Sequence, residues 1–229
     1  MANLAIGELA ALEGRFAWAM LEMDIDYWDR GNRTLAAVAD ERGVLLSDLC
    51  VQVQECSSHE GTDDYPVLRG LSAVELIDHI TKNQFPVLNK EMANLTRRIP
   101  QVLQRYRGED RRLALIEVAF SQVRSELVSH IAQQRYVFFP AIRERELRTG
   151  GFRPRKSWTE KMAFRRDELV AGLMPLRSYS DDFCEPPNGE PVWKAMVESL
   201  KRLTYCGYHH IYTLTWVLLP LLSQSEEDC

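Results

Sequence analysis

Two eleven-residue segments of this chain each place a histidine where it could do chemistry. HIAQQRYVFFP begins at His130 and HIYTLTWVLLP begins at His210, and both begin with His-Ile and end with Pro. Each histidine falls on the apolar stripe of a predicted helix, so both imidazoles are expected to face the interior. One helical turn after each histidine, where a metal site would need a carboxylate, the chain has Gln134 and Leu214. The segments therefore indicate a histidine site whose acidic partners are missing.

Five polar residues lie on the predicted inward-facing stripes or at the end of one. They are Tyr106, His130, Gln134, Arg166 and His210. A buried polar group without a hydrogen-bond partner costs about 1–3 kcal/mol, and an unpaired charge costs more. We therefore expect these side chains to satisfy one another in a polar core network.

The alternative is a residual cofactor site in which His130 and His210 bind haem or a single metal. Two imidazoles without carboxylates suit a soft or axial-ligand arrangement better than a di-iron centre. The charge of Arg166 would oppose a dication but would tolerate haem propionates. A third reading is that the helices have another register, in which case the five residues do not meet. No nucleophile elbow, phosphate-binding loop or dinucleotide fingerprint is present in the sequence.

Four long amphipathic patterns would position these side chains. In the second pattern the apolar steps alternate three and four without a break, which is the period of a helix in a bundle. Two patterns begin with a capping box, Ser72-x-x-Glu75 and Ser157-x-x-Glu160. Because no convincing strand pattern occurs, the sequence predicts an all-α fold with an antiparallel four-helix bundle. The stripes are Val74, Ile77, Phe85, Leu88, Met92 and Leu95; Leu113, Ile116, Phe120, Val123, Leu127, His130, Gln134 and Val137; Met162, Arg166, Leu169 and Leu173; and Met196, Leu200, Leu203, Gly207, His210, Leu214, Val217 and Leu221.

A separate group of short helical patterns precedes the bundle and predicts a small helical N-terminal domain over residues 1–57. Thr34 has the chemistry of an N-cap for one of these helices, and Gly43 closes it. Residues 58–70 are predicted to be a linker because Gly, Ser, Asp and Pro are concentrated there. The bundle is then expected over residues 71–229.

The composition excludes several functional classes. The chain is 45% hydrophobic and 27% charged, which is typical of a globular protein. No apolar run of about 18 residues predicts a membrane span, and the acidic start is unlike a signal peptide. Five irregularly spaced cysteines fit reduced thiols, so a cytoplasmic protein is expected.

Charge is unevenly distributed along the chain. Residues 1–65 contain 4 Arg and 13 Asp or Glu, whereas the remainder contains 24 basic and 20 acidic residues. An acidic N-terminal domain and a mildly basic bundle can attract each other within or between chains. The chain is not basic enough to indicate nucleic acid. We therefore expect a protein partner or a homodimer, and neither a nucleic acid nor a membrane.

Several motifs together resemble the Repair of Iron Centres (RIC) family over almost the whole chain. They are AIGELA near the start, DYWDRGNRTLAAVADERG from Asp26, ELIDHI from Glu75, the two His-x9-Pro segments, and DDFCEPP from Asp181. RIC proteins are bacterial di-iron proteins tied to nitric-oxide and oxidative stress. The resemblance implies a ScdA-type N-terminal domain, a hemerythrin-like four-helix bundle and a link to iron–sulfur cluster repair.

Most residues that the resemblance would assign to this chemistry are replaced. The two adjacent cysteines of the family's N-terminal loop correspond to Trp28 and Asp29. The first two histidines of the family's bundle align with Phe85 and Tyr106, and the fourth falls near Arg166. The resemblance therefore implies that neither the thiol chemistry nor most iron ligands are retained.

His130 and His210 are the two ligands, of seven expected, that this chain keeps. The glutamate that follows each of them in the family is replaced by Gln134 and by Leu214. Bridged irons need anionic oxygen, so the comparison implies a fold in which packing has replaced the cofactor.

These observations lead to one main hypothesis and two alternatives. The main hypothesis is a metal-depleted RIC homologue with no cofactor, which leans toward a non-enzymatic role as an interaction or regulatory protein. The first alternative is a protein that binds haem or a single metal through His130 and His210. The second alternative is a retained role in iron–sulfur cluster repair through transient iron handling.

Overall fold

The structure of this chain is a computed structural model. It describes residues 4–12, 16–17, 19–20, 23–27, 30–56, 67–68, 70–106, 108, 110–149, 156–184 and 189–224. Within these ranges it describes the backbone but not the side chains of residues 11, 12, 56, 145, 147–149, 156–167, 223 and 224.

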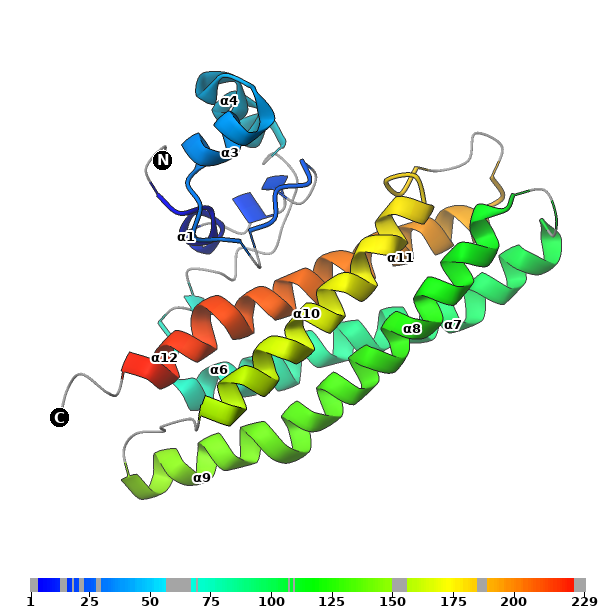
Figure 1. Ribbon diagram of the computed structural model, residues 1–229. Helices are drawn as coiled ribbons and strands as arrows, with labels where there is room; N and C mark the ends of the chain where they lie inside the picture. Colours follow the sequence, from blue (N-terminus) through cyan, green and yellow to red (C-terminus); the bar gives the residue numbers. More distant parts are fainter. Residues whose placement is uncertain are drawn as a thin grey trace. The chain divides into compact units, whose positions relative to one another are not determined.

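Every regular element in these ranges is a helix, so the prediction of an all-α protein is confirmed (Figure 1). The sole β-type pairing among the described residues is an isolated antiparallel bridge between Ala5 and Thr34. The helices are α1 (Ile6–Leu12), α3 (Leu35–Arg42), α4 (Leu46–Cys56), α6 (Ala73–His79), η1 (Ile80–Gln84), α7 (Phe85–Arg105), α8 (Arg112–Gln133), η2 (Gln134–Phe138), α9 (Phe139–Thr149), α10 (Lys156–Tyr179), α11 (Pro191–Tyr212), η3 (Thr213–Leu218) and α12 (Leu219–Gln224), where η denotes a π-helix.

Local side-chain chemistry sets two helix ends as the sequence predicts. At the start of α3, Thr34 Oγ1 accepts the N–H of Ala37 at 3.1 Å, and Gly43 with φ of 65° closes the helix. Before α6, the N–H of Ser72 donates to the Glu75 carboxylate at 2.9 Å, and Ser72 Oγ accepts the N–H of Glu75 at 3.4 Å. These bonds from Ser72 lower the pKa of Glu75, because they stabilise its ionised form.

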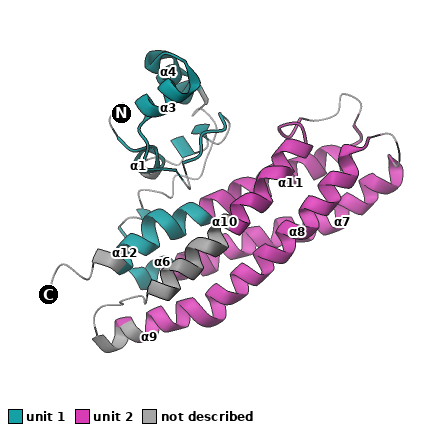
Figure 2. Ribbon diagram, in the orientation of Figure 1, with its two compact units in different colours: residues 1–76, 211–224 teal, residues 77–210, 225–229 magenta. Residues whose placement is uncertain are grey.

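The chain divides into two compact units (Figure 2). Unit 1 contains residues 1–76 together with 211–224, and unit 2 contains residues 77–210 and 225–229. The end of the last helical segment thus groups with the N-terminal part of the chain, a division that differs from the predicted 1–57, 58–70 and 71–229.

Most of the predicted linker, residues 58–66 and 69, lies outside the described residues, as do Trp28 and Asp29.

Four long helices lie side by side in unit 2: α7, α8, α10 and α11 up to His210 (Figures 1 and 2). Two glycines allow close approach between them. A Cβ on Gly172 of α10 would lie 3.1 Å from the Val123 side chain of α8, and one on Gly207 of α11 would lie 2.7 Å from that of Leu173. Arg98 of α7 bonds to α11 through the Ala195 carbonyl at 3.0 Å.

The core of unit 2 is formed by the apolar stripes of these helices. Its buried members include Phe85, Leu88, Met92, Leu95, Leu113, Ile116, Phe120, Val123, Leu127, Leu169, Leu173, Met196, Leu200 and Leu203. All of them belong to the stripes that the sequence predicts, because the three–four spacing places them on one side of each helix.

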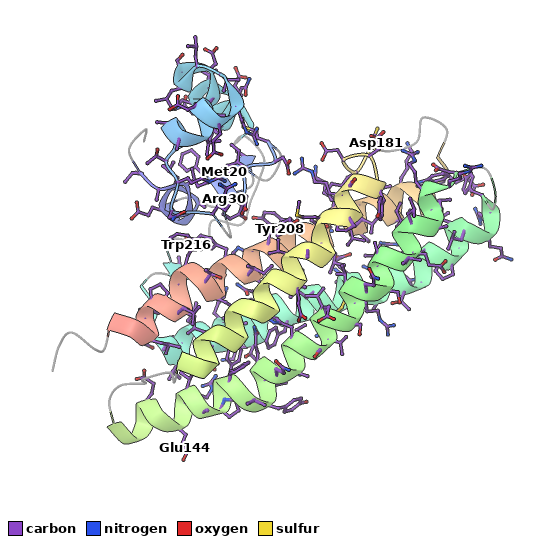
Figure 3. All side chains as sticks on the ribbon, in the orientation of Figure 1. Met20, Arg30, Glu144, Asp181, Tyr208 and Trp216 are labelled. Carbon is purple, nitrogen blue, oxygen red and sulfur yellow. The ribbon has the colours of Figure 1, made fainter. Side chains whose placement is uncertain are left out.

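In unit 1 a tryptophan of η3 packs against two N-terminal glycines. A Cβ on Gly7 would lie 3.0 Å from the ring of Trp216, and one on Gly31 would lie 2.5 Å from it (Figure 3 labels Trp216). The Tyr212 hydroxyl donates to the Gly7 carbonyl at 3.0 Å, and the Tyr212 and Tyr27 rings are 5.8 Å apart. Tyr212 is therefore part of the core of unit 1, and the half-buried ring of Trp216 packs at its edge.

The π-helical turns were not predicted, and each is followed by proline at the second position of the next helix. The prolines are Pro86, Pro140 and Pro220. In an α-helix a proline ring collides with the carbonyl four residues earlier. In a π-turn the backbone bonds reach five residues back, and the N–H of Phe85 donates in this way to the carbonyl of Ile80. The wider turns allow the helices to continue through the prolines.

The π-turn in η2 also corrects the predicted stripe of the second pattern. Val137 was expected to face the core, but its side chain is 51% exposed, and Phe138 is buried instead. A π-turn contains one residue more than an α-turn, so it shifts the buried face by one position.

Candidate functional site

The structure brings His130 of α8 and His210 of α11 together in unit 2. Their ring centroids are 5.3 Å apart and the rings are nearly perpendicular, at 87°. His130 is 7% exposed and His210 is fully buried. His130 and His210, the first residues of the two similar segments, therefore lie together in one buried site.

Each histidine is bonded to a glutamine side chain. His130 Nε2 lies 2.6 Å from Gln134 Nε2, one helical turn further along the chain. Because an amide nitrogen can only donate, His130 Nε2 accepts this hydrogen bond. His210 Nδ1 lies 2.7 Å from Gln84 Oε1, and because an amide oxygen can only accept, Nδ1 is the protonated nitrogen of His210. These four side chains form what we call the imidazole–amide cluster.

Gln84 is the member of the cluster that sequence reasoning missed. It is the last residue of η1, and both Gln84 and its neighbour Phe85 are buried, at 7% and 0% exposure. Two adjacent residues on one α-helix differ in direction by about 100°, so a regular stripe could include only one of them. The signal that could have revealed Gln84 is Pro86, since a proline follows the start of each helix after a π-turn.

All three π-turns lie next to members of the cluster in the sequence. Gln84 ends η1, Gln134 begins η2, and His210 precedes η3 by three residues. π-turns inside α-helices are frequent at functional sites. Their placement supports the cluster as the candidate site of this chain.

Aromatic rings enclose the cluster. The Phe85 ring contacts His210 in an edge-on arrangement at 5.6 Å and stacks on Phe139 at 5.9 Å. The guanidinium carbon of Arg135 lies 5.5 Å from the centroid of the Phe85 ring. Among the described side chains, two phenylalanine rings therefore pack at the cluster, and the cation of Arg135 lies over one of them.

His210 is uncharged at neutral pH. Burial lowers the pKa of His210 well below its ordinary value, and the neighbouring His130 lowers this pKa further. Desolvation disfavours a charged imidazole when no anion compensates it. His210 is therefore a neutral base whose Nε2 carries a lone pair.

Two acceptor atoms of the cluster have no hydrogen-bond partner. They are His210 Nε2 and Gln134 Oε1, both fully buried. A buried acceptor without a donor loses its hydration energy and gains nothing in return, at a cost of about 1–3 kcal/mol. The hydrogen-bonding capacity of the cluster is thus only partly used, because these two acceptor atoms lack donors.

The residues present do not fit a di-iron centre. A bridged pair of iron ions needs carboxylates, and the positions one turn after the histidines hold an amide, Gln134, and the buried hydrocarbon of Leu214. Phe85, which the family resemblance aligns with a histidine, packs its ring on His210. Over the described side chains, no group of three or more His, Cys, Asp or Glu could hold a metal ion.

The structure does not place Tyr106 in the polar network where the sequence predicted it. Tyr106 caps the C-terminal end of α7, whereas Gln84 caps its N-terminal end, and a helix of 21 residues is roughly 30 Å long. The Tyr106 ring instead contacts Trp193 at 4.4 Å, and its hydroxyl accepts the N–H of Glu190 at 3.3 Å. Arg166 lies in α10, and its side chain is outside the described residues.

Two other buried titratable groups lie on α11. Burial lowers the pKa of His209 to about 4, with a further contribution from His79. Burial also raises the pKa of the Cys206 thiol to about 11, and the Glu91 carboxylate adds to this effect. A protonated thiol is a poor nucleophile, so Cys206 has the properties of a packing residue.

No family model matches this chain, and no curated protein matches it significantly. In the described part of the chain, no helix has the length and apolar character needed to cross a membrane.

Proposed function

We propose that this chain is a metal-depleted RIC-type protein, with a hemerythrin-like antiparallel four-helix bundle, that acts through protein contacts rather than catalysis. The motifs that resemble the RIC family support this proposal, as do the four long helices of unit 2. Its expected setting is cytoplasmic iron–sulfur cluster repair and nitrosative stress.

One observation carries the proposal: the cluster around His130 and His210 contains amides where a di-iron centre needs carboxylates. Gln134 bonds to His130, Gln84 bonds to His210, and neither amide supplies an anion. Iron ions in such a place would be buried without charge compensation, which costs several kcal/mol per charge. The site therefore fits a structural role better than an iron-dependent reaction.

The partner is proposed to be a second copy of the chain or another stress protein. The excess of acidic residues over residues 1–65 and of basic residues in the remainder supports association between chains. Sedimentation analysis at about 0.05 and 0.5 M salt tests the homodimer, because salt screens attraction between exposed charges. A dimer that weakens with salt is expected, and a monomer at every concentration would contradict the homodimeric form.

Metal analysis tests the loss of the di-iron centre. The chain is purified from iron-supplemented cells, reconstituted anaerobically with Fe(II), and its metal content is measured. Wild type should retain far less than one iron per chain, and two irons per chain would refute the proposal. Gln134→Glu is the matched variant, since it restores one anionic oxygen beside His130 and should raise iron retention above that of wild type.

A second candidate, a single bound ion, is favoured by the free lone pair of His210 Nε2. Haem is a poorer fit, because a haem held on both faces needs two imidazoles that point at one iron from opposite sides. Here one imidazole presents its edge to the face of the other at 5.3 Å.

A further inference from the structure

The side of α8 that faces away from the bundle carries no charge along its centre over residues 114–132. Three apolar residues on this side, Leu115, Val118 and Val128, are 47%, 58% and 51% exposed. The charged residues of the stretch lie about 80–120° around the helix from Val118, and they are Glu117, Arg124 and Glu126. The uncharged positions on the outer side are Ala114, Leu115, Val118, Ser121, Gln122, Ser125, Val128, Ser129, Ala132 and Gln133.

The outer sides of two neighbouring helices do carry charges. α7 exposes Lys90 and Arg97 there, and α11 exposes Lys194 and Glu198. Charged residues opposite the buried stripe are the ordinary pattern of a surface helix. Of these three helices, α8 is the one whose exposed centre lacks charge. Depletion of charge together with exposed apolar side chains is typical of the centre of a surface that another protein covers.

Six residues on this side form what we call the outer seam of α8: Ala114, Val118, Ser121, Ser125, Val128 and Ala132. Their steps alternate four and three, which is the spacing of a helix that packs along a second helix. Four of the six are Ala or Ser, and such small side chains let two helix axes approach to about 8 Å. The buried stripe of α8 has the same alternation, so this helix has one seam for its own bundle and another that is exposed.

The outer seam reads nearly the same in both directions. Counted from Ser121, Val118 lies three positions before and Ser125 lies four positions after. Ala114 and Val128 lie seven positions before and after it. A two-fold symmetric interface needs such a self-complementary surface, because each residue meets the same set of residues on the second copy. An antiparallel pair of α8 helices centred near Ser121 meets this condition.

The charges beside the seam fit the same arrangement. Glu117 and Arg124 are exposed on one flank of α8, seven residues apart, which is about 10 Å along the axis. In an antiparallel two-fold pair, equivalent flanks of the two helices face each other. With the two-fold axis near Ser121, Glu117 of each copy lies beside Arg124 of the other copy. The arrangement thus forms two reciprocal ion pairs at the edge of an uncharged seam.

We infer that the outer seam of α8 is the surface through which two copies of this chain associate, as an antiparallel two-fold dimer. The inference deepens the proposed association between copies and rests on it, but it does not depend on the proposed loss of iron. The seam is roughly 28 Å long, and one helix face is smaller than a standard interface of about 800 Å² per partner. A reversible dimer is therefore expected.

The first test is sedimentation equilibrium of the full-length chain from about 1 to 100 μM. Ser121→Arg places two like charges and two long side chains together at the two-fold axis and should weaken the wild-type dimer at least tenfold. Ala93→Arg is the matched control, because it adds the same side chain at an exposed small residue of α7. It should leave the dimer unchanged, and circular dichroism verifies that both variants fold.

An exchange of charges tests the antiparallel register. Glu117→Arg and Arg124→Glu each bring like charges together and should weaken the dimer about two- to tenfold. The double variant restores both ion pairs with reversed sign and should recover the wild-type affinity. A double variant that associates no better than the single variants would overturn the register and, with it, the inference.

A disulfide gives a readout that does not depend on affinity. Ser121→Cys brings two thiols together at the two-fold axis, and a disulfide needs Cα atoms about 4.4–6.8 Å apart. Mild oxidation should crosslink this variant well above the background that wild type gives through its five cysteines. Ala93→Cys should not exceed that background, and equal crosslinking of the two variants would overturn the inference.

The outcomes also separate this inference from the proposed function. A wild-type dimer that Ser121→Arg leaves intact would overturn the role of the outer seam but leave the proposed association standing. A monomer at every concentration would overturn both the seam and the homodimeric form. The loss of the di-iron centre would be unaffected in either case, because the iron content decides it separately.

Discussion

The two echoing segments have the same framework but different surroundings. Each runs from a buried histidine through a π-turn to a proline, in η2 after His130 and in η3 after His210. At the seventh position the first segment has Tyr136, which is 73% exposed, whereas the second has Trp216, which packs on two glycines of unit 1. The seventh position thus faces solvent in the first segment and packs against residues of unit 1 in the second.

The fifth position differs in the same sense. Gln134 keeps a polar side chain bonded to His130, while Leu214 is 5% exposed hydrocarbon. The two segments therefore share their backbone geometry and their histidine, but the side chains around these features differ. The segment at His130 completes a polar cluster, and the segment at His210 adds apolar packing to unit 1.

The largest expected effect comes from truncation of the aromatic residue at the seventh position. Trp216→Ala should destabilise the protein by about 3 kcal/mol, because it removes the ring that packs on Gly7 and Gly31. Tyr136→Ala removes a side chain that is 73% exposed and should change stability by no more than about 0.5 kcal/mol. Urea denaturation of both variants measures the difference. Similar losses would show that the two segments do not differ in packing.

An exchange at the fifth position should give the next largest effect. Leu214→Gln buries an amide in a hydrocarbon position and should cost about 2–3 kcal/mol. Gln134→Leu removes an acceptor that has no partner but also removes the donor to His130 Nε2, so the two effects partly offset and its cost should be about 1 kcal/mol. Thermal unfolding followed by circular dichroism compares them. A larger loss for Gln134→Leu would mean that the bond to His130 outweighs the unpaired oxygen.

The packing of Trp216 can be tested from its glycine side. A Cβ on Gly31 would lie 2.4 Å from the Tyr27 carbonyl oxygen, which is backbone and cannot move aside cheaply. Gly31→Ala should therefore cost about 2 kcal/mol and change the fluorescence of the neighbouring Trp216. Gly70→Ala is the matched control in unit 1, since its nearest contact would be an ordinary 3.6 Å. If both variants have wild-type stability, the close approach at Gly31 is not required.

The sequence predicted those parts of the fold that depend on local spacing and caps. The stripes of Phe120 and Leu200, the cap at Thr34 and the capping box at Ser72 each follow from residues within a few positions of one another. The same spacing also predicted that His130 and His210 face the interior. Gln84 was missed because a π-turn makes two successive residues face inward, which no 3.6-residue period describes.

Other features depend on contacts between distant residues, which spacing alone does not contain. Tyr106 was placed in the cluster because its polarity suited the network, but the length of α7 puts it at the other end of that helix. The contact of Trp216 with Gly7 and Gly31 joins residues 209 and 185 positions apart. The recurrent prolines Pro86, Pro140 and Pro220 are the sequence signal for the π-turns, because each follows one of them by two positions.

The smallest expected effect is a dependence of stability on pH, which we expect from the histidine that precedes the second segment. The residue before the second echo, His209, is buried with its pKa lowered to about 4, whereas Ser129 stands before the first. His209 is neutral in the folded protein and takes up a proton near pH 6.5 when unfolded. Its contribution to stability is therefore complete above pH 6.5 and is lost as pH falls toward 4. Between pH 7 and 5 His209 should account for about 1–2 kcal/mol of the loss, in addition to the loss from His210, whose pKa burial also lowers. Guanidinium denaturation at both values measures it, with His209→Phe as a variant that cannot titrate and fills the same space. An equal loss in that variant would assign the acid sensitivity to other groups.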